Sequence, residues 1–257
     1  MLDFVRELPK TIEILELTSE FYDGAAWVGI LAENVYAIWY GRKLGLSLWK
    51  TVASMLMASV LVVLAMALLQ SIISAVFDES LGIMNSLLNN IGRTFVLVPL
   101  IAWLIAITIK VPWKKICGIY AVAQPIVWGT ASIGCLFSGC CRGYACSWGI
   151  YNVMTHGYVF PTQLINVLAL WSIAVFLHLR MKKRGYQLDG SEYPIMLILV
   201  GLTRFLTEFI MENQKIVFGL SSLSFDSLVM CIVGTVMFLV IHFKGKKQLQ
   251  AHETLAE

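Results

Sequence analysis

Charged residues are scarce in this 257-residue sequence: they make up 14% of it, whereas hydrophobic residues make up 58%. Several apolar runs approach the roughly 20 residues that a helix needs to cross a hydrocarbon core of about 30 Å. The net charge is only +3, and it is spread over the ends of the apolar runs, which excludes a nucleic-acid partner. We therefore predict an all-α polytopic membrane protein.

The sequence also lacks a second domain, a low-complexity linker and an exact internal repeat. Residues 1–24 have neither the basic start nor the small-residue cleavage site of a signal peptide, and they place acidic residues among Ile and Leu at helical spacing. We predict an amphipathic interfacial segment at residues 1–24, one membrane domain at 25–243 and a cytoplasmic tail at 244–257.

Seven transmembrane helices are predicted within the membrane domain. They lie at residues 25–40, 52–76, 94–109, 116–137, 163–179, 193–210 and 223–243. Lys and Arg concentrate in the first, third and fifth connections and in the tail, whereas the other connections hold at most one basic residue each. The positive-inside rule then places the N-terminus outside and the C-terminus in the cytoplasm.

Four of the six cysteines gather at the outer end of the fourth apolar run: Cys135, Cys140, Cys141 and Cys146. Three interpretations remain open. Cys140 or Cys141 could form a disulfide with Cys146 in an oxidising compartment, or the adjacent Arg142 could activate a nucleophilic thiolate. Metal binding together with His156 is the third, but the spacing matches no established zinc pattern, so we expect no metal site and no cofactor.

Ionisable residues inside apolar helices are costly and therefore candidates for function. Arg204 and Glu208 stand four residues apart, so they share one face of the sixth helix and can form an ion pair. Glu33 lies in the middle of the first helix, where it could pair with Arg93 or Arg204. Arg93 itself could contact substrate or anchor the third helix at the interface.

Three glycines accompany the cysteines: Gly134, Gly139 and Gly143. Glycines at such spacing permit close approach of helices or a break in the backbone that meets a ligand. Downstream, Pro161 is typical of a first helical turn and places the amide of Gln163 at the outer boundary of the fifth helix.

The segment from Pro125 to Gly143, the Phe160-Pro-Thr-Gln-Leu helix start and the later Gly201-Leu-Thr-Arg-Phe-Leu-Thr-Glu-Phe run resemble prolipoprotein diacylglyceryl transferases. The resemblance covers residues 25–243. It implies a seven-span bacterial inner-membrane enzyme that moves diacylglyceryl from phosphatidylglycerol to the thiol of a lipobox cysteine in a preprotein. It further implies a site that faces the outer leaflet.

Residue by residue, the resemblance assigns catalysis to Arg204 and Glu208 and assigns substrate binding to other matching positions, with two further arginines available for phosphate. The substrate-binding set is Arg93, Arg142, Gly134, Gly139, Gly143 and Gln163. Cys135 and Cys140 stand where the family carries asparagine and glutamate, which makes them candidate catalytic thiols.

Two further positions depart from the family: Ser132 replaces its essential arginine, and Val96 replaces its third-helix histidine. We therefore predict a divergent phospholipid-dependent transferase. The alternatives are a non-catalytic lipid- or peptide-binding relative and a thiol-disulfide or metal-handling membrane protein.

Overall fold

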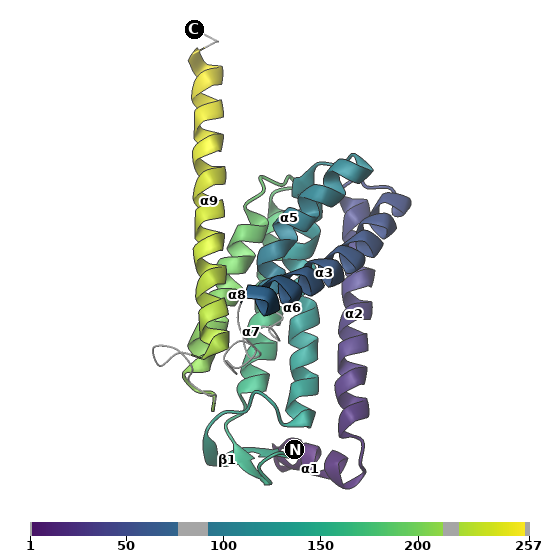
Figure 1. Cartoon of the computed structure of the whole chain (residues 1–257), viewed down its shortest axis with the longest axis vertical. Coiled ribbons are helices and arrows are strands. Elements are labelled where there is room, and N and C mark those ends of the chain that lie inside the picture. The colour runs from purple at the N-terminus through teal and green to yellow at the C-terminus, as the bar shows by residue number, and fades with distance from the viewer. Residues whose placement is uncertain (1, 77–91, 213–220, 255–257) are drawn as a thin grey trace.

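The computed structural model describes residues 2–76, 92–212 and 221–254, most of which are helical (Figure 1). The elements in chain order are α1 (Leu2–Ile14), α2 (Thr18–Lys43), α3 (Leu48–Val76), α5 (Gly92–Ile109), α6 (Trp113–Ser138), β1 (Ala145–Asn152), β2 (Gly157–Val159), α7 (Thr162–Lys183), α8 (Glu192–Glu208) and α9 (Ser222–Thr254). The all-α prediction is confirmed apart from one short hairpin, β1–β2.

A helix lies at each of the seven positions predicted to cross the membrane. Within the described ranges, four helices are long and apolar enough to span a bilayer: Leu48–Ala65, Trp113–Ser138, Thr162–Lys183 and Leu223–Lys244. α5 contains a shorter apolar helix, and α8 has 17 residues with Arg204 and Glu208 among them. Composition therefore supports four spans, and the count of seven stays a prediction.

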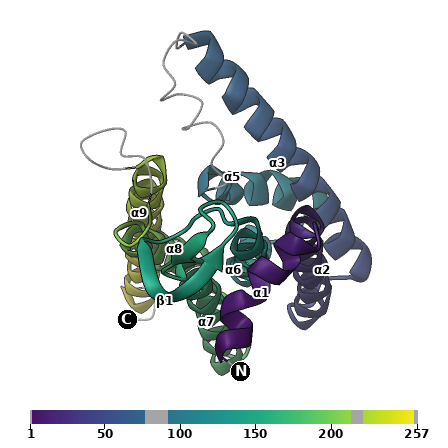
Figure 2. The same cartoon turned by 90° about the horizontal axis from the view of Figure 1, so that it is seen from below.

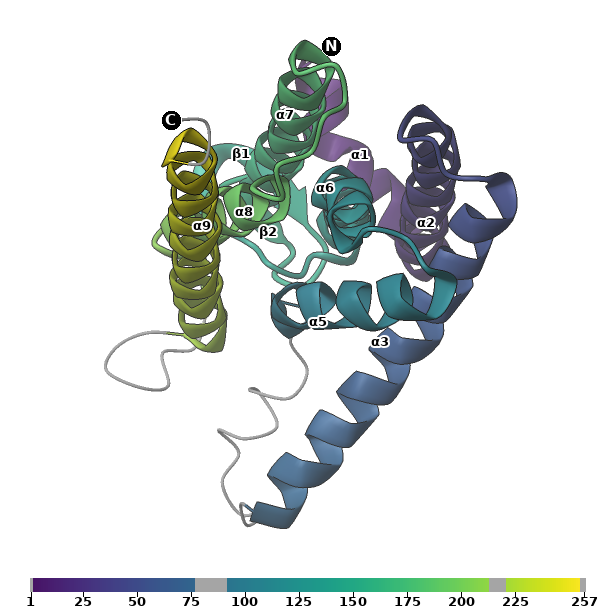
Figure 3. The same cartoon turned by 90° about the horizontal axis from the view of Figure 1, so that it is seen from above.

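α6 occupies the centre of the bundle. It packs against α2 on one side and α7 on the other, while α9 pairs with α8. In α6, 67% of the residues are buried, whereas in the apolar part of α3, Leu48–Ala65, only 17% are. Figure 3 shows α3 running obliquely along the outside, away from the central helix.

Pro99 leaves a gap in the hydrogen-bond ladder of α5, and a tyrosine from another helix closes it. A proline has no amide N–H, so the carbonyl of Phe95 one turn earlier lacks its helical donor. The hydroxyl of Tyr193 in α8, which is fully buried, donates to that carbonyl at 2.8 Å. The same hydroxyl contacts the side-chain amide of Gln124 in α6 at 2.7 Å. One buried phenol thus connects α5, α6 and α8.

The connections rich in Lys and Arg meet at one end of the bundle. Lys50 Nζ donates to the carbonyl of Lys110 at 3.5 Å, and Lys115 Nζ donates to the carbonyl of Leu44 at 2.5 Å. The hairpin β1–β2 and α1 lie at the opposite end, next to the end of α6 that carries the cysteines (Figure 1). The connections that are rich in Lys and Arg therefore lie at one end of the fold, and these cysteines lie at the other.

α1 lies beside the hairpin, as the view from below shows (Figure 2). Arg6 donates from Nε to the carbonyl of Gly149 and from a terminal nitrogen to that of Ser147, both at 2.9 Å. The Tyr158 hydroxyl donates to the Glu7 carboxylate. Within residues 1–24, α1 ends at Ile14 and α2 begins at Thr18.

Candidate functional site

Three thiols converge where α6 ends. The sulfur atoms of Cys135, Cys140 and Cys141 all lie within 4.8 Å of one another, and all three residues are half-buried. Gly139 ends α6 in the left-handed conformation, with φ of 75°, and Cys141 adopts φ of 53°. A non-glycine residue rarely takes a positive φ, so tertiary contacts must hold Cys141 in place. We call these three residues the thiol cluster.

The first turn of α7 fixes the backbone of the thiol cluster. Gln163 Nε2 donates to the carbonyl of Cys140 at 2.7 Å, and Thr162 Oγ1 donates to the carbonyl of Cys141 at 2.6 Å. Both donors are almost completely buried. Gln163, predicted as a substrate contact, thus lies beside the cysteines but uses its amide to position them. The neighbouring Thr162 was not predicted.

The two cysteines that follow α6 differ in acidity. Hydrogen bonds from the thiols of Cys135 and Cys141 lower the pKa of Cys140 well below that of an ordinary thiol. For Cys141 the hydrogen bond with Cys135 lowers the pKa, but the bond with Cys140 and burial outweigh it and raise the pKa. Cys140 is therefore the more acidic of these two thiols.

Cys146 lies apart from the thiol cluster. It belongs to β1, where its sulfur packs beside Gly149, and all six cysteines are free thiols. The structure therefore does not contain the disulfide that the sequence allowed between Cys146 and its neighbours. His156, considered as a metal ligand with the cysteines, instead lies 3.2 Å from the Glu13 carboxylate.

Arg204 lies close to the thiol cluster and does not pair with Glu208. Its guanidinium carbon is 4.8 Å from the centre of the Trp128 ring, and its positive charge acts on Cys141. Within residues 92–212 and 221–254, no carboxylate forms an ion pair with Arg204. Glu208 accepts a hydrogen bond from the hydroxyl of Ser221 just before α9. The ion pair predicted from the spacing of four is wrong, because each side chain turns toward a different neighbouring element.

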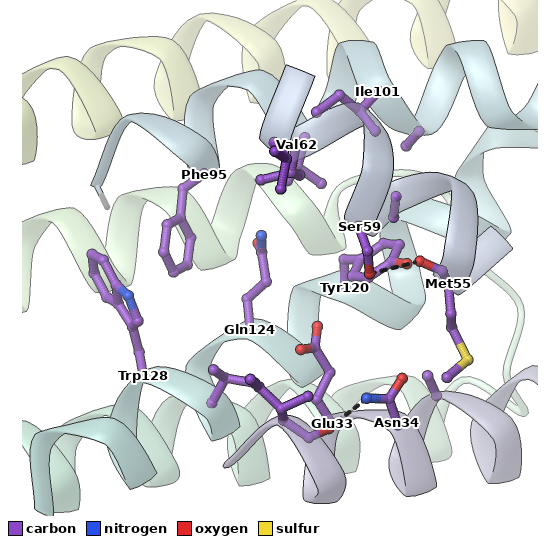
Figure 4. Close-up of a pocket in the computed structure, with 17 residues that line it drawn as sticks. Glu33, Asn34, Met55, Ser59, Val62, Phe95, Ile101, Tyr120, Gln124 and Trp128 are labelled. Carbon is purple, nitrogen blue, oxygen red and sulfur yellow. Dashed lines mark hydrogen bonds between the residues drawn. The ribbon is translucent and has the colours of Figure 1, made fainter. Parts of the chain in front are cut away.

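A cavity of about 400 Å³ lies between α2, α3, α5 and α6 (Figure 4). Its lining is mostly aliphatic, and Figure 4 shows the polar side chains of Glu33 and Gln124 directed into it. Trp128, the residue under Arg204, lies at one end of this lining. Among the side chains that the structure describes, none forms an ion pair with Glu33. Gln124 and Trp128 were missed, because a single amide or aromatic residue in an apolar run carries no pattern.

The glycines predicted to bind substrate make close backbone contacts. A Cβ on Gly134 would lie 3.0 Å from the carbonyl oxygen of Tyr22 in α2, and one on Gly143 would lie 2.7 Å from that of Phe160. Gly139 provides the positive φ described above. The structure thus gives the three glycines roles in packing and chain direction.

The two additional arginines occupy different surroundings. Arg142 Nε donates to Glu212 at 3.0 Å, an ion pair that is partly exposed and links the segment after α6 to the end of α8. Arg93 stands in the first turn of α5, and its side chain lies outside the part of the structure that is described. Of the predicted site residues, the fold therefore brings Cys135, Cys140, Gln163 and Arg204 together.

Comparison with known protein families agrees with the resemblance noted in the sequence. The model of the prolipoprotein diacylglyceryl transferase family matches residues 9–240, from the middle of α1 into α9. The chain therefore belongs to this family. No curated protein matches the chain significantly.

Proposed function

We propose that this family member is a phospholipid-dependent transferase. In the proposed reaction, the acceptor's thiolate sulfur forms a bond to the terminal glyceryl carbon of a phosphatidylglycerol-like donor. The bond between that carbon and the phosphate oxygen breaks, and glycerol phosphate leaves. The proton of the acceptor thiol passes to a basic group of the site, which the reaction needs because an unperturbed thiol has a pKa of about 8.5. The proposed acceptor is a cysteine in a lipobox-bearing preprotein.

The placement of Arg204 carries this proposal. It is a half-buried cation in a membrane helix that no described carboxylate neutralises, and it lies over the face of Trp128. A guanidinium held against a ring keeps its N–H groups directed sideways, where they can form the paired hydrogen bonds that phosphate accepts. Arg204 is therefore the proposed clamp for the donor phosphate and for the leaving group.

The cavity beside Trp128 is the proposed place for an acyl chain of the donor. Its volume is about 400 Å³ and its walls are largely aliphatic. A lipid that enters sideways between α2, α3 and α5 would bring its headgroup toward Arg204. Its acyl chain would leave the bilayer and pack against the aliphatic walls of the cavity. Arg93 and Arg142 are proposed to supply further positive charge, and Glu208 to orient the site through Ser221.

We further propose that the site faces the outer leaflet of a bacterial inner membrane, with the N-terminus outside and the C-terminus in the cytoplasm. The support is the separation described above: the basic connections meet at one end, and the thiol cluster lies at the other. The positive-inside rule assigns the basic end to the cytoplasm.

A second candidate function is lipid or peptide binding without catalysis. It is favoured by Ser132, which stands where the family has its essential arginine and whose hydroxyl donates to the carbonyl of Trp128 in its own helix. A serine used in this way offers no charge to a phosphate.

Labelled phosphatidylglycerol and a peptide with a single cysteine, added to the purified full-length protein in nanodiscs, test the proposal. We expect label to appear on the peptide as a thioether. Arg204→Ala should abolish transfer, whereas Arg184→Ala should retain it, because Arg184 lies at the opposite end, where it pairs with Asp189 and more distantly with Glu192. Lipid binding without transfer, under conditions where another family member is active, would establish the binding function instead.

A further inference from the structure

We infer that Cys135, Cys140 and Cys141 form a three-thiolate site for one zinc-like metal ion, and that the remaining coordination position accepts the thiol of the acceptor. The second part of this inference rests on the proposed transferase function. The first part stands on the geometry of the cluster alone. It differs from the metal interpretation considered for the sequence, because His156 does not take part.

The distances fit such an ion. Zinc binds thiolate sulfur at about 2.3 Å, so two sulfurs on one tetrahedral ion lie about 3.8 Å apart. The three sulfurs are already within 4.8 Å of one another, so small side-chain rotations suffice to bring them onto one ion. Three ligands from the protein and one open position are the arrangement that catalytic zinc sites use.

The surroundings hold the ligands in place. The backbone carbonyls of Cys140 and Cys141 are fixed by Gln163 and Thr162, and the carbonyl of Gly139 accepts a 2.8 Å hydrogen bond from Asn152. Every residue from 139 to 141 therefore has an external anchor, which limits the rearrangement that metal binding requires. Such outer contacts are typical of metal sites, where they keep the ligands oriented.

The charges also fit. Three thiolates and one divalent ion sum to one negative charge, and Arg204 acts electrostatically on Cys141. A single arginine can therefore balance the site before the acceptor thiolate binds as the fourth ligand. The same arginine is the proposed phosphate clamp, so metal and donor phosphate would be neighbours.

The open position explains how a transferase could work without the family's histidine, which is Val96 here. If the acceptor thiol bound the ion, a metal–sulfur bond would form and the S–H bond would break, and the proton would pass to water, so that the metal would take the place of the basic group in the proposed reaction. A thiol that coordinates a metal ion is deprotonated outright at neutral pH. The bound thiolate then attacks the glyceryl carbon as described above. No oxidant or reductant is required.

Cobalt provides a direct test, because thiolate-to-cobalt charge transfer absorbs strongly in the near ultraviolet. The reduced full-length protein in nanodiscs is titrated with Co²⁺ alone, and we expect saturation at one ion per chain, reversed by Zn²⁺. Cys140→Ser should weaken binding by at least about 100-fold, more than the loss of a typical outer contact. Cys146→Ser, in the same segment but outside the cluster, should bind as the unmodified protein does.

Near-ultraviolet circular dichroism of each variant shows that it is folded, so weak binding by a folded Cys140→Ser reports the site itself. No charge-transfer band in the unmodified protein, or equal binding by Cys140→Ser and Cys146→Ser, would overturn the metal site.

A second arm tests the open position. Adding a peptide with a single cysteine to the cobalt-loaded protein should shift the spectrum toward four thiolate ligands, and the serine version of the peptide should not. An unchanged spectrum would overturn acceptor binding to the metal. Cobalt binding together with a failed transfer assay would refute the transferase and leave the metal site standing.

Discussion

The hydroxyl of Tyr193 in α8 donates a 2.8 Å hydrogen bond to the carbonyl of Phe95, the group that Pro99 deprives of its helical donor. Phe95 in turn packs against Trp128, with ring centres 4.2 Å apart. The tyrosine therefore supports the part of the cavity wall that Phe95 and Trp128 form.

Tyr193→Phe should destabilise the protein by about 1–3 kcal/mol, because it leaves the carbonyl of Phe95 buried without a donor. In a Pro99→Ala background the restored amide N–H can serve that carbonyl, so the same substitution should cost less. Thermal denaturation of the four proteins in one detergent measures both costs. Equal costs in the two backgrounds would show that the tyrosine does not compensate for the proline.

Trp128→Leu should weaken donor binding by about 2- to 30-fold, which corresponds to the roughly 0.5–2 kcal/mol of a cation–π contact. The cause is loss of the surface on which Arg204 rests. Trp103→Leu is the matched control, because Trp103 lies on the exposed side of α5. Titration of phosphatidylglycerol into the delipidated protein gives the affinities. Equal effects from Trp128 and Trp103 would remove the argument for an arginine clamp at this ring.

Gly134→Ala should destabilise the protein by about 1–3 kcal/mol, because the added methyl group would lie 3.0 Å from the carbonyl oxygen of Tyr22 and force α2 away from α6. Gly24→Ala is a contrasting substitution in α2, since nothing lies within 4 Å of the new methyl group. It should be neutral or stabilise the helix by up to about 1 kcal/mol. Denaturation midpoints distinguish the two, and a neutral Gly134→Ala would contradict the close packing.

Gln163→Ala should lower both the denaturation midpoint and the cobalt affinity, the latter by about 10- to 100-fold, as expected for an outer contact of a metal site. The reason is that the carbonyl of Cys140 loses its buried donor. Gln187→Ala, at an exposed position beyond α7, is the control. A variant that loses stability but keeps its cobalt affinity would show that Gln163 supports the fold without orienting the thiols.

The sequence predicted the positions of the helices well, because an apolar run bounded by charge or proline determines a membrane helix almost locally. α6 and α7 begin and end within four residues of the predicted limits, and Pro161, expected in the first turn, is the N-cap residue of α7. The hairpin was missed, although Trp148 and Tyr151 in β1 and the turn before Gly157 are weak strand signals. β2 has only three residues, and the hairpin is held by α1 through contacts such as that of Arg6 with Gly149 in β1.

The site was predicted only in part. The cysteine segment, Gln163 and Arg204 were identified and do lie together, but their partners come from packing between helices distant in sequence. Spacing alone suggested that Arg204 pairs with Glu208. In the structure Arg204 lies over Trp128, and Glu208 accepts a hydrogen bond from Ser221. Both partners are more than ten residues away along the chain, so the spacing does not reveal them.

α9 is 33 residues long, which at 1.5 Å per residue gives a rod of about 50 Å. A hydrocarbon core of about 30 Å accounts for only part of that length. The helix extends beyond the rest of the bundle at the end away from the thiol cluster (Figure 1). A fluorescent protein fused to this helix would be connected by a rigid helical segment rather than by a flexible linker. Its orientation would therefore report the tilt of α9 in the bilayer.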